Sequence, residues 1–358
     1  MTKRDTSVET GTNLATTPSG NAWDDDDDAY LDSIAGRLSE RQQREIELVE
    51  AVKAVYVACG RDKVLDDMLA TFVVSMLAKK NGRRDDGRIF FITGESGAGK
   101  TAAIARALSR SDALQPQLRS FGLVKPVISV SLSGGAVTLK AVGHQIAEAA
   151  GYPVKETVGQ NDMWKRLPDI LHQRRVLLVH IDETQHVLKR TETDQERKNL
   201  AKAIKGLSNF EAWPINFILS GTPETTEIAR LDQQFERRGK FLFLSDIAMP
   251  EEKALVDRMI REMAGAIGMA TDRLIASDVP ERVAHAARYR YGRIAQMVLA
   301  GIQVAIHKGA NELVRDHFAY AYLELSHARG RDEMNPFLVD DWRNLPAGYF
   351  LIEEQRET

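Results

Sequence analysis

The eight residues from Gly94 to Thr101, GESGAGKT, constrain the fold of this chain more than any other segment. They fit the pattern G-x-x-x-x-G-K-[ST] in full, between the apolar run RIFFIT and a helical pattern. Glycines let successive backbone N–H groups point inward, and the start of the helix adds partial positive charge. The segment predicts a phosphate-binding loop, in which Lys100 reaches the β- and γ-phosphates and the Thr101 hydroxyl ligates Mg²⁺. The residues expected to bind the nucleotide here are Gly94, Glu95, Ser96, Gly97, Ala98, Gly99, Lys100, Thr101 and Ala102.

Apolar segments alternate with helical patterns through the middle of the chain. The apolar segments are residues 88–93, 126–132, 175–182, 215–221 and 240–244. Continuous apolar strands that alternate with helices are typical of a parallel sheet that is covered on both faces. After Pro250 the pattern is helical only, to about Arg329. We therefore expect an α/β fold with a parallel five-stranded sheet flanked by helices, followed by an all-helical lid.

A second acidic motif, VLLVHIDE, ends about eighty residues after the glycine loop. Asp182 is expected to hold the metal through its water shell, and Glu183 to polarise the attacking water. We interpret His180, inside the strand, as a packed core histidine. An Asp-Glu pair with a helical lid downstream indicates the AAA+ division of P-loop ATPases, with ATP and Mg²⁺ as cofactors.

A polar sensor is expected on the strand between the two motifs of an AAA+ protein. The segment INFILSGTPE offers Ser220 and Thr222 for this role. The usual asparagine is absent from the tip of this strand, because Asn216 lies at the other end.

Arginines in two later segments are candidates for contacts with phosphates. Arg237 and Arg238 precede the last strand, where an AAA+ protein delivers an arginine to the γ-phosphate of a neighbouring subunit. The alternative is a pair of solvated arginines in a loop. In the lid, Arg293 follows Gly292 at a helix start and is expected to touch the nucleotide, with Arg288 and Arg290 as competitors.

Composition divides the chain of 358 residues further. We expect a disordered acidic tail at 1–28, an N-terminal helical region at 29–82, a nucleotide-binding domain at 83–249, a helical lid at 250–330 and a C-terminal tail for partner docking at 331–358. A single cysteine, Cys59, fits a reducing compartment. No stretch approaches the roughly 20 apolar residues that span a bilayer, so we expect a cytoplasmic protein with no membrane partner.

Five short segments in this order resemble one family. GESGAGKT, VHIDETQHV, LSGTPE and FERRGKFLFL, with NPF near the C-terminus, are similar to the TniB/TnsC group of transposition ATPases, relatives of the Mu B protein. The resemblance covers about residues 82–337. It implies ATP-dependent oligomerisation on double-stranded DNA as a ring or helical filament. It also implies recruitment of a DDE transposase, a target-selection protein as partner, and disassembly on hydrolysis.

The same resemblance implies where DNA is contacted. In related proteins the contacts come from the segment after the second strand, which makes Thr138 and Lys140 the candidates here, with Lys155 behind them. Contacts to the DNA backbone give little sequence specificity, and a few per subunit suffice in a filament, so the net charge of −3 is no obstacle. The alternative for Lys140 is an exposed helix lysine.

Two other functions fit the motifs. One is a nucleotide-switched scaffold that acts chiefly by binding proteins. The intact Glu183 argues against a scaffold that has lost hydrolysis entirely. The other is an AAA+ ATPase similar to replication initiators, which would be expected to carry a DNA-reading module such as a helix-turn-helix. The sequence shows no convincing module of that kind.

Overall fold

The structure, a computed structural model, describes residues 21–132, 138–155, 157–189, 194–231 and 233–348. Contacts divide the chain into two compact units, Met1–Ala54 and Val55–Thr358. Within the described residues, no helix has the length and apolar character that crossing a membrane requires.

In the described residues of the first unit there are two helices, α1 (Asn21–Ala35) and α2 (Glu40–Lys53). The aspartate run Asp24–Asp28 lies within α1, so residues 21–28 are helical, contrary to the predicted disordered tail. Residues 1–20 of that tail lie outside the described residues.

Helix α2 begins with a reciprocal cap. The backbone N–H of Gln42 donates to Oγ of Ser39 at 3.3 Å, and the backbone N–H of Ser39 donates to Oε1 of Gln42 at 3.1 Å. Two N–H groups that would lack partners are thereby satisfied.

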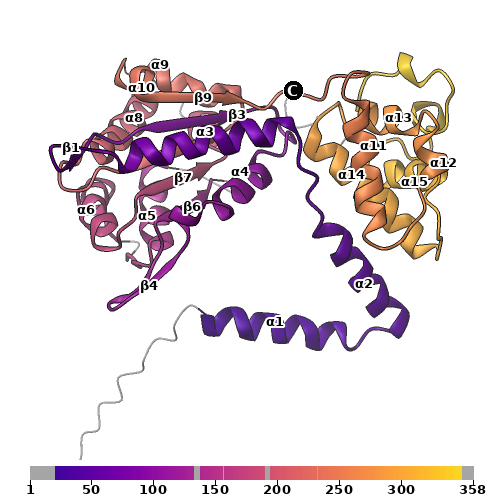
Figure 1. Cartoon of the computed structure of the whole chain (residues 1–358), viewed down its shortest axis with the longest axis horizontal. Coiled ribbons are helices and arrows are strands. Elements are labelled where there is room, and N and C mark those ends of the chain that lie inside the picture. Colours follow the sequence, from indigo (N-terminus) through magenta and orange to yellow (C-terminus); the bar gives the residue numbers. More distant parts are fainter. Residues whose placement is uncertain (1–20, 133–137, 156, 190–193, 232, 349–358) are drawn as a thin grey trace, which may run out of the picture. The chain divides into compact units, whose positions relative to one another are not determined.

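The second unit begins before the predicted domain boundary at residue 82. Its first helix, α3 (Gly60–Leu77), buries Leu65, Leu69 and Phe72 against Phe90 and Ile92 of the sheet. Figure 1 shows α3 alongside strand β3. Helix α3 therefore belongs with the sheet rather than with α1 and α2, and the boundary lies between Ala54 and Val55.

A parallel five-stranded sheet forms the centre of the second unit, as the sequence predicted. Its order is β6-β7-β8-β3-β9. The bounds are β6 Val127–Ser131, β7 Leu178–Asp182, β8 Asn216–Gly221, β3 Ile89–Thr93 and β9 Gly239–Phe243. Thr93 of β3 pairs with Gly221 of β8, and Ile181 of β7 pairs with Leu219. The carboxyl ends of β3, β8 and β7 consequently lie side by side at one edge.

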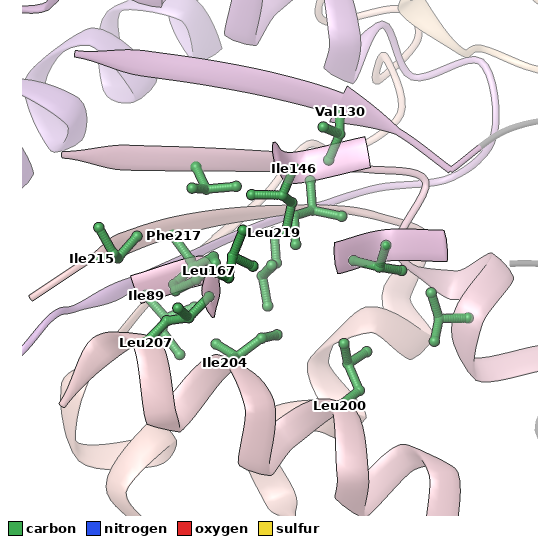
Figure 2. Packing of buried hydrophobic residues seen from close by; sticks show 14 of the residues in the cluster. Ile89, Val130, Ile146, Leu167, Leu200, Ile204, Leu207, Ile215, Phe217 and Leu219 are labelled. Carbon is green, nitrogen blue, oxygen red and sulfur yellow. The ribbon is translucent and has the colours of Figure 1, made fainter. Parts of the chain in front are cut away.

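Helices cover both faces of the sheet, because successive residues of a buried strand point to opposite faces. Phe90 and Ile92 face α3 and α4 (Lys100–Ser109). Figure 2 shows the other face, where Ile89, Phe217 and Leu219 pack against Ile204 and Leu207. The helices on that face are α5 Leu139–Ala149, α6 Gln160–Gln173 and α8 Asp194–Ser208.

Several short elements were not anticipated from the sequence. Two antiparallel hairpins are present, β1–β2 and β4–β5. The short strands and helices are β1 Lys79–Lys80, β2 Arg83–Arg84, β4 Gln117–Arg119, β5 Gly122–Val124, α7 Gln185–Lys189, α9 Glu227–Arg230 and α10 Gln233–Arg238. Strands this short carry too little hydrophobic periodicity to be recognised in a sequence.

The region after Pro250 is helical, which confirms the expected lid. Its helices are α11 Lys253–Gly265, α12 Asp272–Ile275, α13 Val279–Ala286, α14 Tyr291–His307 and α15 Arg315–Leu325.

Residues 331–348, the described part of the segment predicted as a tail for partner docking, are not a free tail. Asn335, Phe337 and Trp342 are all buried. Nδ2 of Asn335 donates to the carbonyl of Ala319 at 3.0 Å, and the ring of Phe337 stacks on Phe318 with 5.6 Å between centroids. Residues 335–342 therefore complete the core of the lid, and the NPF motif has a structural role here.

We expect Phe337→Ala to lower the free energy of unfolding by about 3–5 kcal/mol, because it deletes a fully buried ring. Chemical denaturation checks this. Leu338→Ala is the matched control, since the neighbouring side chain is 43% exposed and should cost much less. Equal effects of the two substitutions would show that the segment does not pack as described.

Candidate functional site

The glycine loop lies between β3 and α4, as predicted. Gly97 and Gly99 have φ angles of 82° and 83°, which favour glycine. A Cβ on Gly97 would also lie 2.6 Å from Cγ of Arg293, so no other residue fits there without displacing that arginine. Helix α4 begins at Lys100, directly after the loop.

Lys100 lies inside the concavity of the loop. It is buried, and its Nζ donates to the carbonyls of Gly94 at 2.9 Å and Glu95 at 3.1 Å. Burial lowers the pKa of Lys100, while the nearby carboxylates of Glu183, Asp182 and Glu95 act in the opposite direction. The ammonium group is thus held by weak neutral acceptors that phosphate oxygens could replace.

Asp182 connects the loop to the middle of the sheet. Its Oδ2 accepts from Oγ1 of Thr101 at 2.6 Å, and its Oδ1 accepts from Oγ of Ser220 at 2.5 Å and from the N–H of Glu183 at 2.9 Å. Burial alone would raise the pKa of Asp182, but these hydrogen bonds outweigh burial and hold the pKa below its usual value. Asp182 is therefore an anion beside the hydroxyl of Thr101.

One carboxylate and one hydroxyl are the donor set that Mg²⁺ requires when the substrate phosphates and water complete its coordination. Thr101 and Asp182 supply this set. No cluster of three or more His, Cys, Asp or Glu that could bind a metal without such help occurs in the part of the chain that the structure describes.

His180 is a packed core histidine, as the sequence indicated. Its Nε2 lies 2.8 Å from Oγ of Ser220, and its Nδ1 lies 3.3 Å from Oγ of Ser129. Burial lowers the pKa of His180, so the imidazole is neutral. Because Ser220 is fully buried and donates to Asp182, it positions that carboxylate, and Thr222 is left as the sensor candidate.

Glu183 is held by a residue that we did not single out in the sequence. Its Oε2 accepts from Nε2 of Gln185 at 2.5 Å, and Oε1 of the same Gln185 accepts from the backbone N–H of Thr222 at 3.1 Å. Gln185 is buried, and it links the expected base to the end of the sensor strand. Nε2 of His186 lies 3.4 Å from the same Glu183 oxygen.

Two lid arginines contact the glycine loop. The backbone N–H of Arg293 donates to the carbonyl of Gly97 at 3.2 Å, and the Arg293 side chain covers that glycine. Nη1 of Arg290 donates to the carbonyl of Ser96 at 2.9 Å. Arg288 instead adopts a positive φ of 57° in the turn before α14. The structure thus brings Arg293 and Arg290 to the loop.

Arg61, at the start of α3, is the functional candidate that the sequence analysis missed. Its guanidinium lies 3.8 Å from the ring centroid of Tyr291, next to Gly99 of the loop. Its Nε, Nη1 and Nη2 are buried and have no hydrogen-bond acceptor among the described residues. Arg61 precedes Lys100 by 39 positions and sits in an ordinary helix start, so nothing in the local pattern connects the two.

Unpaired buried donors are the strongest indication that the loop is built for an anion. Besides Arg61, Nε of Arg290 is buried without an acceptor in the described part of the chain, and the hydroxyl of Thr222 is buried without a partner there. A buried charged donor without an acceptor is costly, which bound phosphate oxygens would relieve. The residues present therefore fit a nucleoside triphosphate with Mg²⁺.

Comparison with known proteins agrees with this geometry. Residues 83–229 match a family model described as an AAA domain. No curated protein matches the sequence. The TniB/TnsC resemblance stays a prediction.

Solved structures show the same fold at low sequence identity. The Aeropyrum pernix ORC1 protein in complex with DNA has a TM-score of 0.54 and 18% identity, over 82% of this chain and 72% of that one. The ORC2 protein of the same organism has a TM-score of 0.53 and 18% identity, over 75% of this chain and 68% of that one. Cdc6p from Pyrobaculum aerophilum has a TM-score of 0.52 and 11% identity, over 77% of this chain and 70% of that one. The chain has the fold of a P-loop AAA+ ATPase, which confirms the predicted fold class.

Arg237 and Arg238 lie away from the glycine loop of their own chain. They end α10, just before Gly239, which pairs with Ile89 at the amino end of β3. The two arginines are therefore at the opposite edge of the sheet from Lys100. Arg238 is engaged there, because its Nη2 pairs with Asp86 at 2.6 Å and its Nη1 donates to Asn209 at 2.7 Å. Arg237 is exposed.

The predicted DNA contacts lie at the start of α5 and beyond its end. Oγ1 of Thr138 accepts from the N–H of Ala141 at 3.2 Å, so this threonine caps the helix. Lys140 is half-buried, and Lys155 is exposed. Residues 133–137 lie outside the described residues, and the contacts with DNA stay a prediction.

We expect Arg61→Met to weaken binding of ATP by about tenfold or more, because a charge-assisted hydrogen bond contributes about 1.5–3 kcal/mol. Its melting temperature without nucleotide should be unchanged or higher, since an unpaired buried charge is removed. Titration with a fluorescent ATP analogue and thermal unfolding measure the two quantities. Lys63→Met, at an exposed position of the same helix, is the control. Unchanged ATP affinity in Arg61→Met would exclude Arg61 from the site.

Proposed function

We propose that this chain is a Mg²⁺-dependent AAA+ ATPase that assembles on duplex DNA and hydrolyses ATP between subunits. The observation that carries the proposal is the joint placement of Lys100 in the loop, the Thr101–Asp182 pair beside it, and Glu183 directly after Asp182. Phosphoryl transfer depends on positioning and charge neutralisation, and these groups supply both.

Each residue has a distinct part in the proposed reaction. Lys100 exchanges the loop carbonyls for the β- and γ-phosphate oxygens, and Thr101 and Asp182 hold Mg²⁺. Mg²⁺ bound there would supply neutralisation of the charge on the transferred phosphoryl group. Glu183 accepts a proton from the attacking water, once Gln185 has oriented or released its carboxylate. Gln185 is hydrogen-bonded both to Glu183 and to the backbone of Thr222, which follows β8. A γ-phosphate bound near Thr222 can therefore change the position of the Glu183 carboxylate through Gln185.

Arg237 is our candidate for the arginine that acts on the neighbouring subunit. It is exposed at the edge of the sheet opposite the loop, whereas Arg238 is held by Asp86 and Asn209. An arginine delivered from another chain makes hydrolysis depend on assembly. We therefore propose a homo-oligomer as the active form.

Two biological roles remain for such an assembly. The motif order and NPF support a regulator of transposition, whose partners would be duplex DNA, a DDE transposase and a target-selection protein. The likeness of fold to the ORC1, ORC2 and Cdc6p structures, one of them in complex with DNA, supports a role similar to that of replication initiators. Both roles require DNA-dependent hydrolysis, and binding of a cognate transposase distinguishes them.

Complementation between two inactive variants tests the proposal. Glu183→Gln should bind ATP yet hydrolyse it at least ~100-fold more slowly, and Arg237→Ala should lose ~1,000-fold or more because the arginine acts on transition-state charge. Mixed together with duplex DNA, the two should regain part of the activity, since one interface then combines an intact Glu183 with an intact Arg237. Steady-state phosphate release measures this.

Arg230→Ala, which removes an exposed arginine at the end of α9, is the control and should hydrolyse ATP normally. The proposal fails if the mixture stays inactive while each variant assembles. It also fails if the wild-type rate per molecule is independent of protein concentration and of DNA.

A further inference from the structure

The β1–β2 hairpin carries a basic motif that the nucleotide site does not use. Lys79 pairs with Arg84, and Lys80 with Arg83, across a turn in which Asn81 and Gly82 have φ angles of 52° and 80°. Four of these six residues are cationic. The hairpin precedes β3, so it lies at the amino end of that strand, away from Lys100.

Arg84 is half-buried, and the buried part includes the charged end of its side chain, which is unusual for an arginine. Its Nη1 and Nη2 have no hydrogen-bond acceptor among the residues that the structure describes. Its guanidinium lies 4.5 Å from the ring centroid of Trp213, and burial lowers the pKa of Arg84. The neighbouring Arg83 differs, because it is exposed and pairs with Glu211 at 2.6 Å.

Trp213 gives Arg84 a rigid support. Its Nε1–H donates to the carbonyl of Val176 at 2.6 Å, and His172 stacks on its ring with 4.9 Å between centroids. The guanidinium of Arg175 also lies over this ring, at 5.4 Å. A fixed guanidinium with its Nη donors unused is pre-organised to bind an oxyanion through parallel hydrogen bonds.

A cavity of about 660 Å³ opens between the hairpin and the loop of residues 210–214. Lys79, Arg83 and Arg84 line it from the hairpin, and Glu211, which is paired with Arg83, lines it from the loop together with Trp213 and Pro214. Its volume is in the range of ligand sites, and it admits a phosphate together with the sugars attached to it.

We propose that the β1–β2 hairpin and Trp213 bind a backbone phosphate of duplex DNA, with Arg84 as the principal ligand. This inference rests on the proposed DNA binding and places a contact outside the predicted segment of Thr138 and Lys140. A nucleic acid is favoured because the exposed Lys79 pairs with Arg84 across the hairpin, and a chain of phosphates engages both cations whereas a single free anion engages one. Since Arg84 and His172 already stack on Trp213, the site offers charge rather than base stacking, and no sequence preference is expected.

Fluorescence anisotropy of a labelled duplex, with full-length protein and a non-hydrolysable ATP analogue, tests the proposal over a range of salt concentrations. Arg84→Gln should weaken binding about tenfold and reduce the slope of log K against log salt by about one, the effect of one lost phosphate contact. Arg83→Gln removes the same charge from the same hairpin and should have a smaller effect, because Arg83 is already paired. Arg84→Lys keeps the charge without the planar fork and should be intermediate.

Two further readouts separate a binding role from a structural one. The melting temperature of Arg84→Gln without DNA should equal or exceed that of the wild type, because an unsatisfied buried charge is removed. Its ATP hydrolysis without DNA should be unchanged. A lowered melting temperature or a loss of DNA-free hydrolysis would overturn the proposal, since Arg84 would then serve the fold or the nucleotide.

The remaining outcomes also test the proposal that the hairpin binds DNA. If the wild type binds DNA and Arg84→Gln binds it no worse than Arg83→Gln does, the site is not a DNA contact, although the proposed function stands. If the wild type binds no DNA, both fail. If Arg84→Gln lowers the affinity for a poly-glutamate peptide but not for the duplex, the cavity binds an acidic protein segment. If Arg84→Gln lowers the affinity for inorganic phosphate alone, the cavity binds a free anion. Either result overturns the proposal.

Discussion

The hydrogen bonds of Asp182 to Thr101 and Ser220 are the constraint on which the rest of the site depends. They tie together the carboxyl ends of β7 and β8 and the loop that follows β3. A buried carboxylate is stable only when it is well paired, and here three donors satisfy it. The strand register makes this possible, because β8 lies between β3 and β7 and its Ser220 reaches Asp182. An apolar sheet thereby places the carboxylate proposed to bind Mg²⁺, the lysine proposed to bind phosphate and the proposed base at one edge.

The opposite edge of the same sheet carries a different chemistry. Arg237 and the β1–β2 hairpin are both placed by strands that begin there, and neither contacts the nucleotide loop of its own chain. Separation of the two edges suits an assembly in which one subunit supplies the nucleotide and its neighbour supplies the arginine. A parallel sheet produces this division without further elements, since all its strands run the same way.

Much of this arrangement could be predicted from the sequence, since its signals are local. The apolar strands, GESGAGKT and the Asp182–Glu183 pair each occupy one short stretch with its own pattern. Arg61 and Gln185 escaped prediction because their roles depend on contacts with Tyr291 and Thr222, which are distant in the chain. The segment around Phe337 was misinterpreted for a related reason. Aromatic residues near a terminus suit an internal core as well as a partner, and only packing distinguishes the two.

Binding of ATP to Lys100→Ala, measured by calorimetry with and without Mg²⁺, tests the central claim most directly. The wild type should bind Mg²⁺–ATP well below millimolar concentrations, and the variant should bind at least ~100-fold more weakly because a charged contact to two phosphates is lost. Lys63→Ala, at an exposed position, should bind as the wild type does. Ordinary ATP affinity in Lys100→Ala, or a wild type that ignores ATP at millimolar concentrations, would contradict a triphosphate site in this loop.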